Sequence, residues 1–317
     1  MKDNWTTADI PSQAGKLAII TGTGGLGYED ALELARAGAE IVLAGRNAGK
    51  GSEAVARIKA AVPGAAISFS LLDLAELSSV QAFAASFASR HDRLDILINN
   101  AAVMALPRRA TTADGFEMQI GTNFLGHFAL TAHLLPLLRK SAAPRVIQLS
   151  SLAHRRGTID FDDLQGERPY NAWKAYSQSK LAMLIFALEL QRRSDAQGWG
   201  LTSLASHPGW ATTDLIANGP AQSGPALLWR LTRLFAPLFS QSAAAGALPT
   251  LYAATASDAE KGGYYGPNGF HEMKGAPSHS KMVGQANDPA VATRLWDAAE
   301  RLTGVSFAEP ARAATTV

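Results

Sequence analysis

The chain has 317 residues, of which 47% are hydrophobic and 18% charged, and its formal net charge is +2. This composition is typical of a chain that buries a sizeable core, and it excludes an intrinsically disordered protein. Its arginine pairs are scattered, so no basic stripe indicates a nucleic-acid partner. Because the chain has no cysteine, disulfides, thiolate nucleophiles and cysteine-ligated zinc are excluded.

The sequence carries no signal of secretion or membrane insertion. Its first fifteen residues are polar, and they include Lys2, Asp3, Asn4 and Asp9. The longest unbroken apolar run, residues 181–188, is much shorter than a membrane span. We therefore expect a soluble, cytoplasmic protein without a membrane anchor.

Short apolar runs alternate with helical patterns along most of the chain. Strands are predicted at residues 17–21, 41–44, 67–71, 96–98, 146–149 and 201–205, and helices at residues 28–37, 51–61, 78–90, 116–139 and 176–193. Strands that are apolar throughout and separated by helices predict a parallel sheet covered on both faces. We expect a Rossmann-like, doubly wound α/β fold in a single domain over residues 1–317.

Some segments interrupt this alternation. Residues 1–15 form an N-terminal arm, and residues 309–317 are expected to be a frayed tail. Residues 215–249 are rich in Pro, Gly, Leu and Phe, too apolar for a disordered linker. We interpret them as a lid over a substrate pocket; the alternative is a helix pair packed on the edge of the core.

A glycine-rich turn follows the first predicted strand. Gly22, Gly24, Gly25 and Gly27 stand between this strand and the next helix. Glycines let the backbone turn tightly and approach a pyrophosphate, whose charge is then stabilised by the N-terminus of the helix. The turn predicts a dinucleotide site, the alternative being a merely structural tight turn.

The end of the second strand bears on the choice of dinucleotide. An NAD enzyme usually carries an acidic residue here, but this chain has Arg46 and Asn47 with Lys50 close behind. A guanidinium can pair with a 2′-phosphate, so we expect NADP(H) to be preferred, with NAD(H) as the other cofactor. Asp73 could accept from the adenine amino group or could cap a helix.

Polar residues gather where the later strands end. Tyr176 and Lys180 are four residues apart and lie on one face of a predicted helix. Ser151 ends the fifth strand, Asn100 ends the fourth, and Asn123 lies within a helical pattern where an amide is poorly placed.

With these residues the chain resembles the short-chain dehydrogenase/reductase family. The matching residues are Thr21, Gly22, Gly25, Gly27, Asn99, Asn100, Ala101, Ala102, Asn123, Gly126, Ser150, Ser151, Tyr176, Lys180, Pro208 and Gly209. They stand in the family's order and spacing from residue 16 to about residue 215. Residues 241–270 look like the retinol-dehydrogenase and protochlorophyllide-reductase-like branch, so the resemblance covers nearly the whole chain.

The resemblance implies a mechanism. Tyr176 is the general acid in reduction and the base in oxidation, and Lys180 and the oxidised nicotinamide favour its phenolate. Ser151 hydrogen-bonds the substrate oxygen, and Lys180 also holds the ribose hydroxyls. Asn123 positions a water that joins Lys180 to solvent.

The resemblance also implies the cofactor contacts. They are Gly22, Thr23, Gly25, Leu26, Gly27, Arg46, Asn47, Asp73, Leu74, Asn100, Ala101, Ala102, Tyr176, Lys180, Pro208, Gly209 and Thr213. The glycine loop is one residue shorter than usual, and Ala102 replaces a usual glycine. The shorter loop weakens the argument for NADP(H).

The substrate and the assembly are less specified. The apolar residues 227–239, with Met104, Trp210 and Leu215 near the expected mouth, predict a bulky hydrophobic ketone, aldehyde or alcohol. The family implies a homodimer or homotetramer, although monomers occur in this branch.

The rival readings are a nucleotide-binding sensor or scaffold without turnover, and a hydrolase. A hydrolase would need a Gly-x-Ser-x-Gly elbow, which is absent. The seven histidines, His127 and His207 among them, show no metal-binding spacing and are expected to be packing or surface residues.

Overall fold

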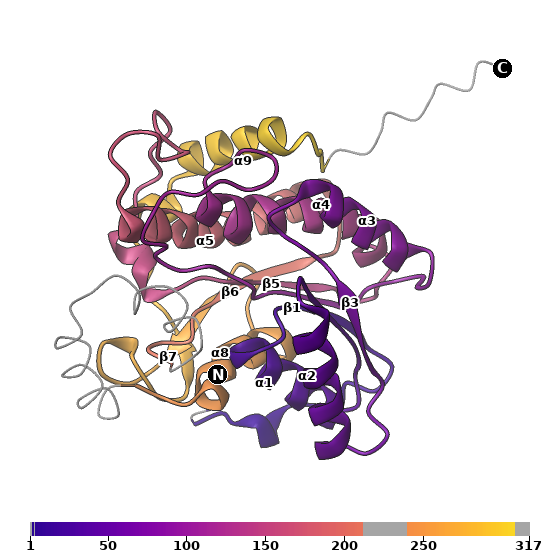
Figure 1. Ribbon diagram of the computed structural model, residues 1–317. Coiled ribbons are helices and arrows are strands. Elements are labelled where there is room, and N and C mark those ends of the chain that lie inside the picture. Colours follow the sequence, from indigo (N-terminus) through magenta and orange to yellow (C-terminus); the bar gives the residue numbers. More distant parts are fainter. Residues whose placement is uncertain (1, 3, 212–239, 308–317) are drawn as a thin grey trace.

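The computed structural model describes residues 2, 4–211 and 240–307. These residues form one eight-stranded sheet in the order β3-β2-β1-β4-β5-β6-β7-β8 (Figure 1). The strands are β1 (Leu17–Thr21), β2 (Glu40–Gly45), β3 (Ile67–Leu71), β4 (Ile96–Asn99), β5 (Arg145–Leu149), β6 (Thr202–Ser206), β7 (Tyr264–Pro267) and β8 (Pro277–His279). Every neighbouring pair is parallel except β7 with β8.

Helices cover both faces of the sheet (Figure 1). One face carries α1 (Gly25–Arg36), α2 (Ala48–Ala61) and α8 (Ala243–Thr255), and the other α3 (Leu77–Ala88), α4 (Gly126–Leu138), α5 (Ala172–Gln197) and α9 (Pro289–Thr303). Each face has its own apolar core. The predicted doubly wound α/β fold is thereby confirmed.

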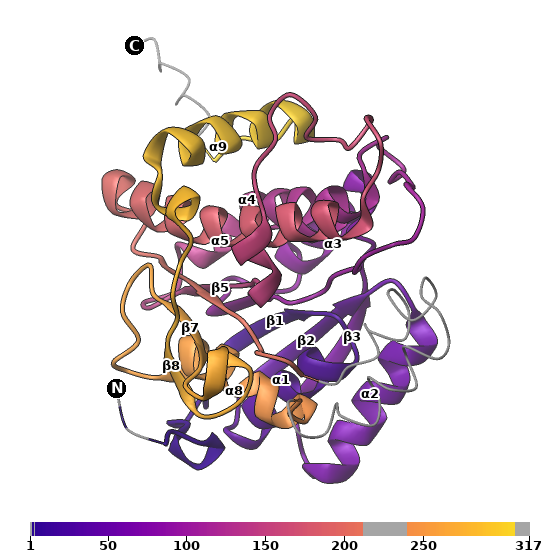
Figure 2. The same ribbon diagram turned by 90° about the vertical axis from the view of Figure 1, so that its left-hand side faces the viewer.

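The six predicted strands are all present, with boundaries shifted by one residue at most. Strands β7 and β8 were not predicted, because Tyr264 and Tyr265 are followed at once by Gly266 and Pro267, which are poor strand formers. Figure 2 shows this pair at the edge of the sheet beside α8. Their pairing is therefore set by packing more than by strand propensity.

The predicted helix over residues 116–139 begins two residues late, at Met118, and its first part is not regular α-helix. Thr111 and Glu117 form an isolated β-bridge, a π-helical turn covers Ile120–Leu125, and α4 begins only at Gly126. A π-turn of this kind inside a helical segment often marks a functional site. Here it contains Asn123.

The predicted lid is wrong for residues 243–249. These residues belong to α8, in which Ala247 and Leu251 are fully buried in the core shared with α1. Burial of an apolar helix against the sheet stabilises it more than exposure over a pocket would. Residues 215–239 of the predicted lid, with Thr213, and the predicted tail lie outside the described residues.

The N-terminal arm is packed onto the fold. Trp5 is buried and lies edge-on to Tyr252 of α8, with the ring centres 5.5 Å apart.

None of the helices in residues 2, 4–211 and 240–307 is both long enough and apolar enough to span a bilayer.

Candidate active site

The glycine turn between β1 and α1 has a backbone that neighbouring groups can approach closely. Gly22 and Gly25 have φ values of +94° and +51°, which L side chains rarely adopt. A Cβ at Gly22 would lie 2.7 Å from Asn100 Nδ2, and one at Gly27 would lie 2.5 Å from the Gly22 carbonyl oxygen. Because Gly24 caps α1 without a side chain, the first N–H groups of the helix stay open to an anion.

Thr21 and Asn100 join β1 to β4, where the strand order reverses. Asn100 Nδ2 donates to the Thr21 carbonyl at 2.7 Å, and the backbone N–H groups of Asn100 and Ala101 donate to Thr21 Oγ1 at 2.9 and 3.0 Å. Ligands of open α/β sheets bind at such a reversal. Ala101 and Ala102 follow directly and are partly exposed.

A polar chain continues from Thr21 into the helix layer through His127. Its Nε2 lies 2.9 Å from Thr21 Oγ1, and its Nδ1 lies 2.8 Å from the Asn123 carbonyl oxygen. Burial lowers the His127 pKa to about 3, so the ring is neutral. Nδ1 then donates to the carbonyl and Nε2 accepts from Thr21. His127 is fully buried, so the expectation of a packing or surface residue missed its polar partners.

The two residues that follow β2 differ in their contacts. Arg46 is exposed and has no ion pair or hydrogen bond with any described residue, whereas Asn47 accepts from Lys50 N–H at 2.9 Å and caps α2. The Thr23 methyl group lies over Gly45, 3.2 Å from the position that a Cβ would take. The glycine turn therefore lies beside the end of β2, which Arg46 follows in the sequence.

Asp73 and Leu74 follow β3 in a local turn. Asp73 Oδ1 accepts from Ala75 N–H at 2.9 Å, and the cap of α3 is Glu76. Asp73 is therefore not the N-cap of α3, although its acceptor is aimed at a nearby amide, as that alternative expected. Leu74 is buried, and its carbonyl oxygen lies 2.4 Å from the place of a Cβ on Gly126. Only glycine lets α4 approach this turn.

The three expected catalytic side chains meet beyond the end of β5. Ser151 caps the 3₁₀ helix Leu152–Arg156, its Oγ accepting from Ala153 N–H at 3.2 Å. Tyr176 lies on α5 and is 4% exposed, and the Ser151 hydroxyl is near enough to its phenol to lower the phenol's pKa against the larger effect of burial. Lys180 Nζ lies 5.9 Å from the centre of the Tyr176 ring and donates to the Leu149 carbonyl at 2.8 Å.

Burial controls the protonation of this group. It raises the pKa of Tyr176 to about 12 against the opposing hydrogen bond from Ser151, and it lowers the pKa of Lys180 to about 7. The expectation that Lys180 and the oxidised nicotinamide together favour the phenolate stays a prediction. In the protein by itself, Tyr176 is a neutral proton donor at neutral pH.

Asn123 uses its whole amide to connect three segments. Its Oδ1 accepts from Val103 N–H at 2.8 Å, and its Nδ2 donates to the Val103 carbonyl at 3.0 Å and to Ser179 Oγ at 2.9 Å. The side chain thereby ties the loop after β4 to α5, one residue before Lys180. The predicted link from Asn123 through water to Lys180 stays a prediction.

The turn after β6 completes the site. Gly209 has φ +61° and donates its N–H to His207 Nδ1 at 3.1 Å, while Trp210 N–H donates to the Met273 carbonyl at 2.8 Å. Gln241 Nε2 donates to the Pro208 carbonyl at 2.7 Å. These contacts hold the segment that the sequence assigned to the cofactor.

The apolar side chains expected at the substrate mouth are partly or largely exposed. Trp210 is 48% exposed, and Met104 is partly exposed; Leu215 lies outside the described residues. The sequence reading missed Trp173, which is 53% exposed and lies edge-on to Tyr176 with 6.0 Å between the ring centres. Its position three residues before Tyr176 on one helix could have indicated this contact.

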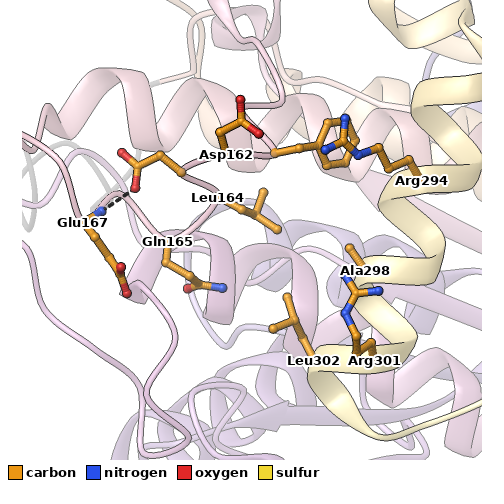
Figure 3. Close-up of a pocket in the computed structure, with 10 residues that line it drawn as sticks. Asp162, Leu164, Gln165, Glu167, Arg294, Ala298, Arg301 and Leu302 are labelled. Atoms are coloured by element: carbon orange, nitrogen blue, oxygen red, sulfur yellow. Dashed lines mark hydrogen bonds between the residues drawn. The ribbon is translucent and has the colours of Figure 1, made fainter.

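A separate hollow lies between the loop after β5 and α9 (Figure 3), where Leu164 and Leu302 face one another. Arg294 stacks over Phe161 at its edge, 4.1 Å from the ring centre. None of Ser151, Tyr176 and Lys180 lines it.

Within residues 2, 4–211 and 240–307, no group of three or more His, Asp or Glu side chains could hold a metal ion.

Comparison with known proteins identifies the family. Residues 16–223 match the short chain dehydrogenase family. The chain is 43% identical to human retinol dehydrogenase 13, covering 96% of this chain and 90% of that protein, and 41% identical to mouse polyprenol dehydrogenase, covering 93% and 86%. The crystal structure of an uncharacterised Mycobacterium paratuberculosis protein is 40% identical, with a TM-score of 0.79 and coverage of 96% and 100%.

These similarities extend through β7 and β8 to α9, well beyond the dinucleotide-binding half of the chain. The chain therefore belongs to the short-chain dehydrogenase/reductase family, in its retinol-dehydrogenase-like branch, and is an NAD(P)-dependent oxidoreductase that acts on CH–OH and C=O groups.

Proposed function

We propose that this enzyme prefers NADP(H) and interconverts a bulky hydrophobic alcohol with its ketone or aldehyde, with Tyr176 as the acid and base. The observation that carries the proposal is the gathering of Ser151, the buried Tyr176 and Lys180 beyond the end of β5, where Ser151 opposes the burial that raises the pKa of Tyr176 and Lys180 Nζ lies 5.9 Å from the centre of the Tyr176 ring. Two hydroxyls at this place can hold one substrate oxygen between them.

The residues present fit a dinucleotide. Gly22, Gly25 and Gly27 leave no Cβ in the path of the pyrophosphate, and the uncapped start of α1 supplies N–H donors for its charge. Pro208 and Gly209 would hold the carboxamide end. When bound, the nicotinamide supplies the hydride in reduction and accepts it in oxidation.

The chain's own residues handle the proton. In reduction Ser151 orients the carbonyl oxygen, and the neutral Tyr176 donates its proton to that oxygen. In oxidation Tyr176 must first lose its proton, which burial opposes. The positive charge of the oxidised nicotinamide and of protonated Lys180 both favour the phenolate, so we infer that base activity depends on cofactor binding.

The exposed apolar side chains of Trp173, Trp210 and Met104 support the proposal of a hydrophobic substrate. Trp173 and Trp210 are large, half-exposed side chains, and Met104 is partly exposed. Exposed aromatic groups near a reactive site favour apolar ligands. Two relatives are named for retinol and polyprenol, both large apolar alcohols.

The decisive measurement follows nicotinamide absorbance with NADPH and with NADH against a panel of carbonyl compounds. We expect turnover of long-chain and ring-bearing aldehydes or ketones, with much lower kcat/KM for small polar sugars. Binding of cofactor without turnover of any carbonyl or alcohol would contradict the proposal and favour a nucleotide sensor.

Arg46→Ala is expected to weaken NADP(H) about 10- to 100-fold and NAD(H) much less, because a hydrogen bond to a charged group contributes about 1.5–3 kcal/mol. Arg46 has no described partner that would otherwise occupy its guanidinium. The measurement is the KM of both cofactors. Arg36→Ala, at the far end of α1, is the control. Equal losses for the two cofactors would remove the phosphate argument.

A further inference from the structure

One carboxylate joins two segments that flank the reactive group. Glu272 Oε2 lies 2.6 Å from Arg155 Nη2, 2.6 Å from Ser280 Oγ and 3.0 Å from His207 Nε2, and the Glu272 side chain is 15% exposed. Burial raises its pKa, but His207, Ser280 and Arg155 outweigh that effect and lower it to about 2. The Glu272 carboxyl group is therefore ionised at neutral pH.

The first arm of this cluster reaches the turn after β6. His207 is fully buried, and its Nδ1 accepts from Gly209 N–H, so its Nε2 carries the proton that faces Glu272 and Ser280. The next residue, Met273, accepts from Trp210 N–H and lies 2.3 Å from the place of a Cβ on Gly209. Glu272 and its neighbour thus hold the turn from two sides.

The second arm reaches the Ser151 loop. Arg155 lies on the 3₁₀ helix that Ser151 caps, and the Ser151 carbonyl accepts from His154 N–H at 3.0 Å and lies 2.6 Å from His154 Nδ1. Tyr264 lies between the arms, its ring centre 5.3 Å from those of His154 and His207. The ion pair of Arg155 with Glu272 therefore acts close to the catalytic serine.

The backbone at this point is strained. His271 and Glu272 have φ values of 51° and 59°, and neither is a glycine. L residues disfavour this left-handed conformation, and it persists where surrounding contacts over-determine it. The contacts of Glu272 with Arg155, His207 and Ser280 are such contacts.

We propose that Glu272 is a positioning residue that holds the Ser151 loop and the Pro208–Gly209 turn at a fixed separation, and so aligns the substrate oxygen with the nicotinamide. This inference rests on the proposed function, since it assumes that these two segments hold substrate and cofactor. Glu272 does not touch the reacting atoms; it acts through Arg155 and His207.

The test compares Glu272→Ala and Glu272→Gln with the wild-type enzyme. We expect Glu272→Ala to lower kcat about 10- to 100-fold, since small misplacements of reacting groups have effects of this size. The KM for cofactor should rise, and the isotope effect on kcat with 4-deuterated NADPH should increase as hydride transfer becomes slower. Glu272→Gln, which keeps the length but loses the charge, should fall between wild type and alanine.

Glu260→Ala is the matched control, because Glu260 also faces a histidine, His279 at 3.8 Å, but its side chain is 73% exposed. Glu260→Ala should leave kcat, the KM for cofactor and the isotope effect on kcat unchanged. A merely structural role for Glu272 would lower the melting temperature and the active fraction while leaving the cofactor KM and the isotope effect as in wild type. That result would overturn the proposal.

Two further measurements keep the outcomes distinct. If Glu272→Ala does not fold, Arg155→Gln removes one arm and leaves Glu272 in place; it should lower kcat with little change in cofactor KM, and an unchanged kcat would overturn the proposal. Cofactor binding, followed by fluorescence, needs no turnover. Wild type that binds NADPH but turns over no substrate contradicts the proposed function, whereas equal NADPH affinity in wild type and Glu272→Ala contradicts this inference.

Discussion

Tyr176→Phe is expected to cut turnover about 100-fold or more while cofactor affinity stays near that of wild type. The phenyl ring keeps its place on α5 beside Trp173, but the hydroxyl proton of Tyr176 is lost. Removing a positioned general acid typically has this effect on the chemical step. The measurements are kcat with a hydrophobic carbonyl and the dissociation constant of NADPH.

Tyr265→Phe is the control for this experiment. Tyr265 is also a buried tyrosine, but it lies on β7, and its hydroxyl accepts from Glu260 N–H at 2.7 Å. We expect it to lower stability modestly and to leave turnover nearly unchanged. Substantial residual activity of Tyr176→Phe would reject Tyr176 as the acid, whatever the control shows.

Asp30→Asn is expected to raise the melting temperature at pH 8 by a few degrees and to have little effect near pH 4. Asp30 lies on the face of α1 that carries Leu26 and Leu34, and it is fully buried. Neither of its carboxylate oxygens has a hydrogen-bond partner among the described residues. Burial, with a smaller contribution from Glu29, raises its pKa well above 3.8.

The sign follows from proton uptake. Between the unfolded value of 3.8 and the raised value in the fold, the folded chain binds more protons than the unfolded chain, so stability falls as pH rises. The loss is about 1.4 kcal/mol per pH unit within that window. Because asparagine cannot ionise, the stability of the Asp30→Asn variant should change less with pH than that of the wild type.

Asp92→Asn makes the same chemical change at an exposed position, so thermal unfolding of the three proteins from pH 4 to pH 8 isolates the effect of burial. A wild-type melting temperature that rises with pH relative to that of Asp30→Asn would show that Asp30 has a partner in solution.

The order of elements and the reactive residues could be read from the chain, because both depend on local patterns. Apolar runs separated by helices specify a covered parallel sheet, and the spacing of Tyr176 and Lys180 puts them on one helical face. Ser151 could be placed at the end of its strand for the same reason. The glycine turn is likewise local, since its conformation is one that other residues rarely adopt.

Protonation and long-range contacts were decided by the tertiary structure. The raised pKa of Tyr176 and the lowered pKa of Lys180 come from burial, which depends on segments distant in sequence. The contacts of Asn123 with Val103 and of Glu272 with Arg155 and His207 join residues far apart in the chain. An amphipathic or polar pattern shows which side chains turn inward; only packing determines which of them meet.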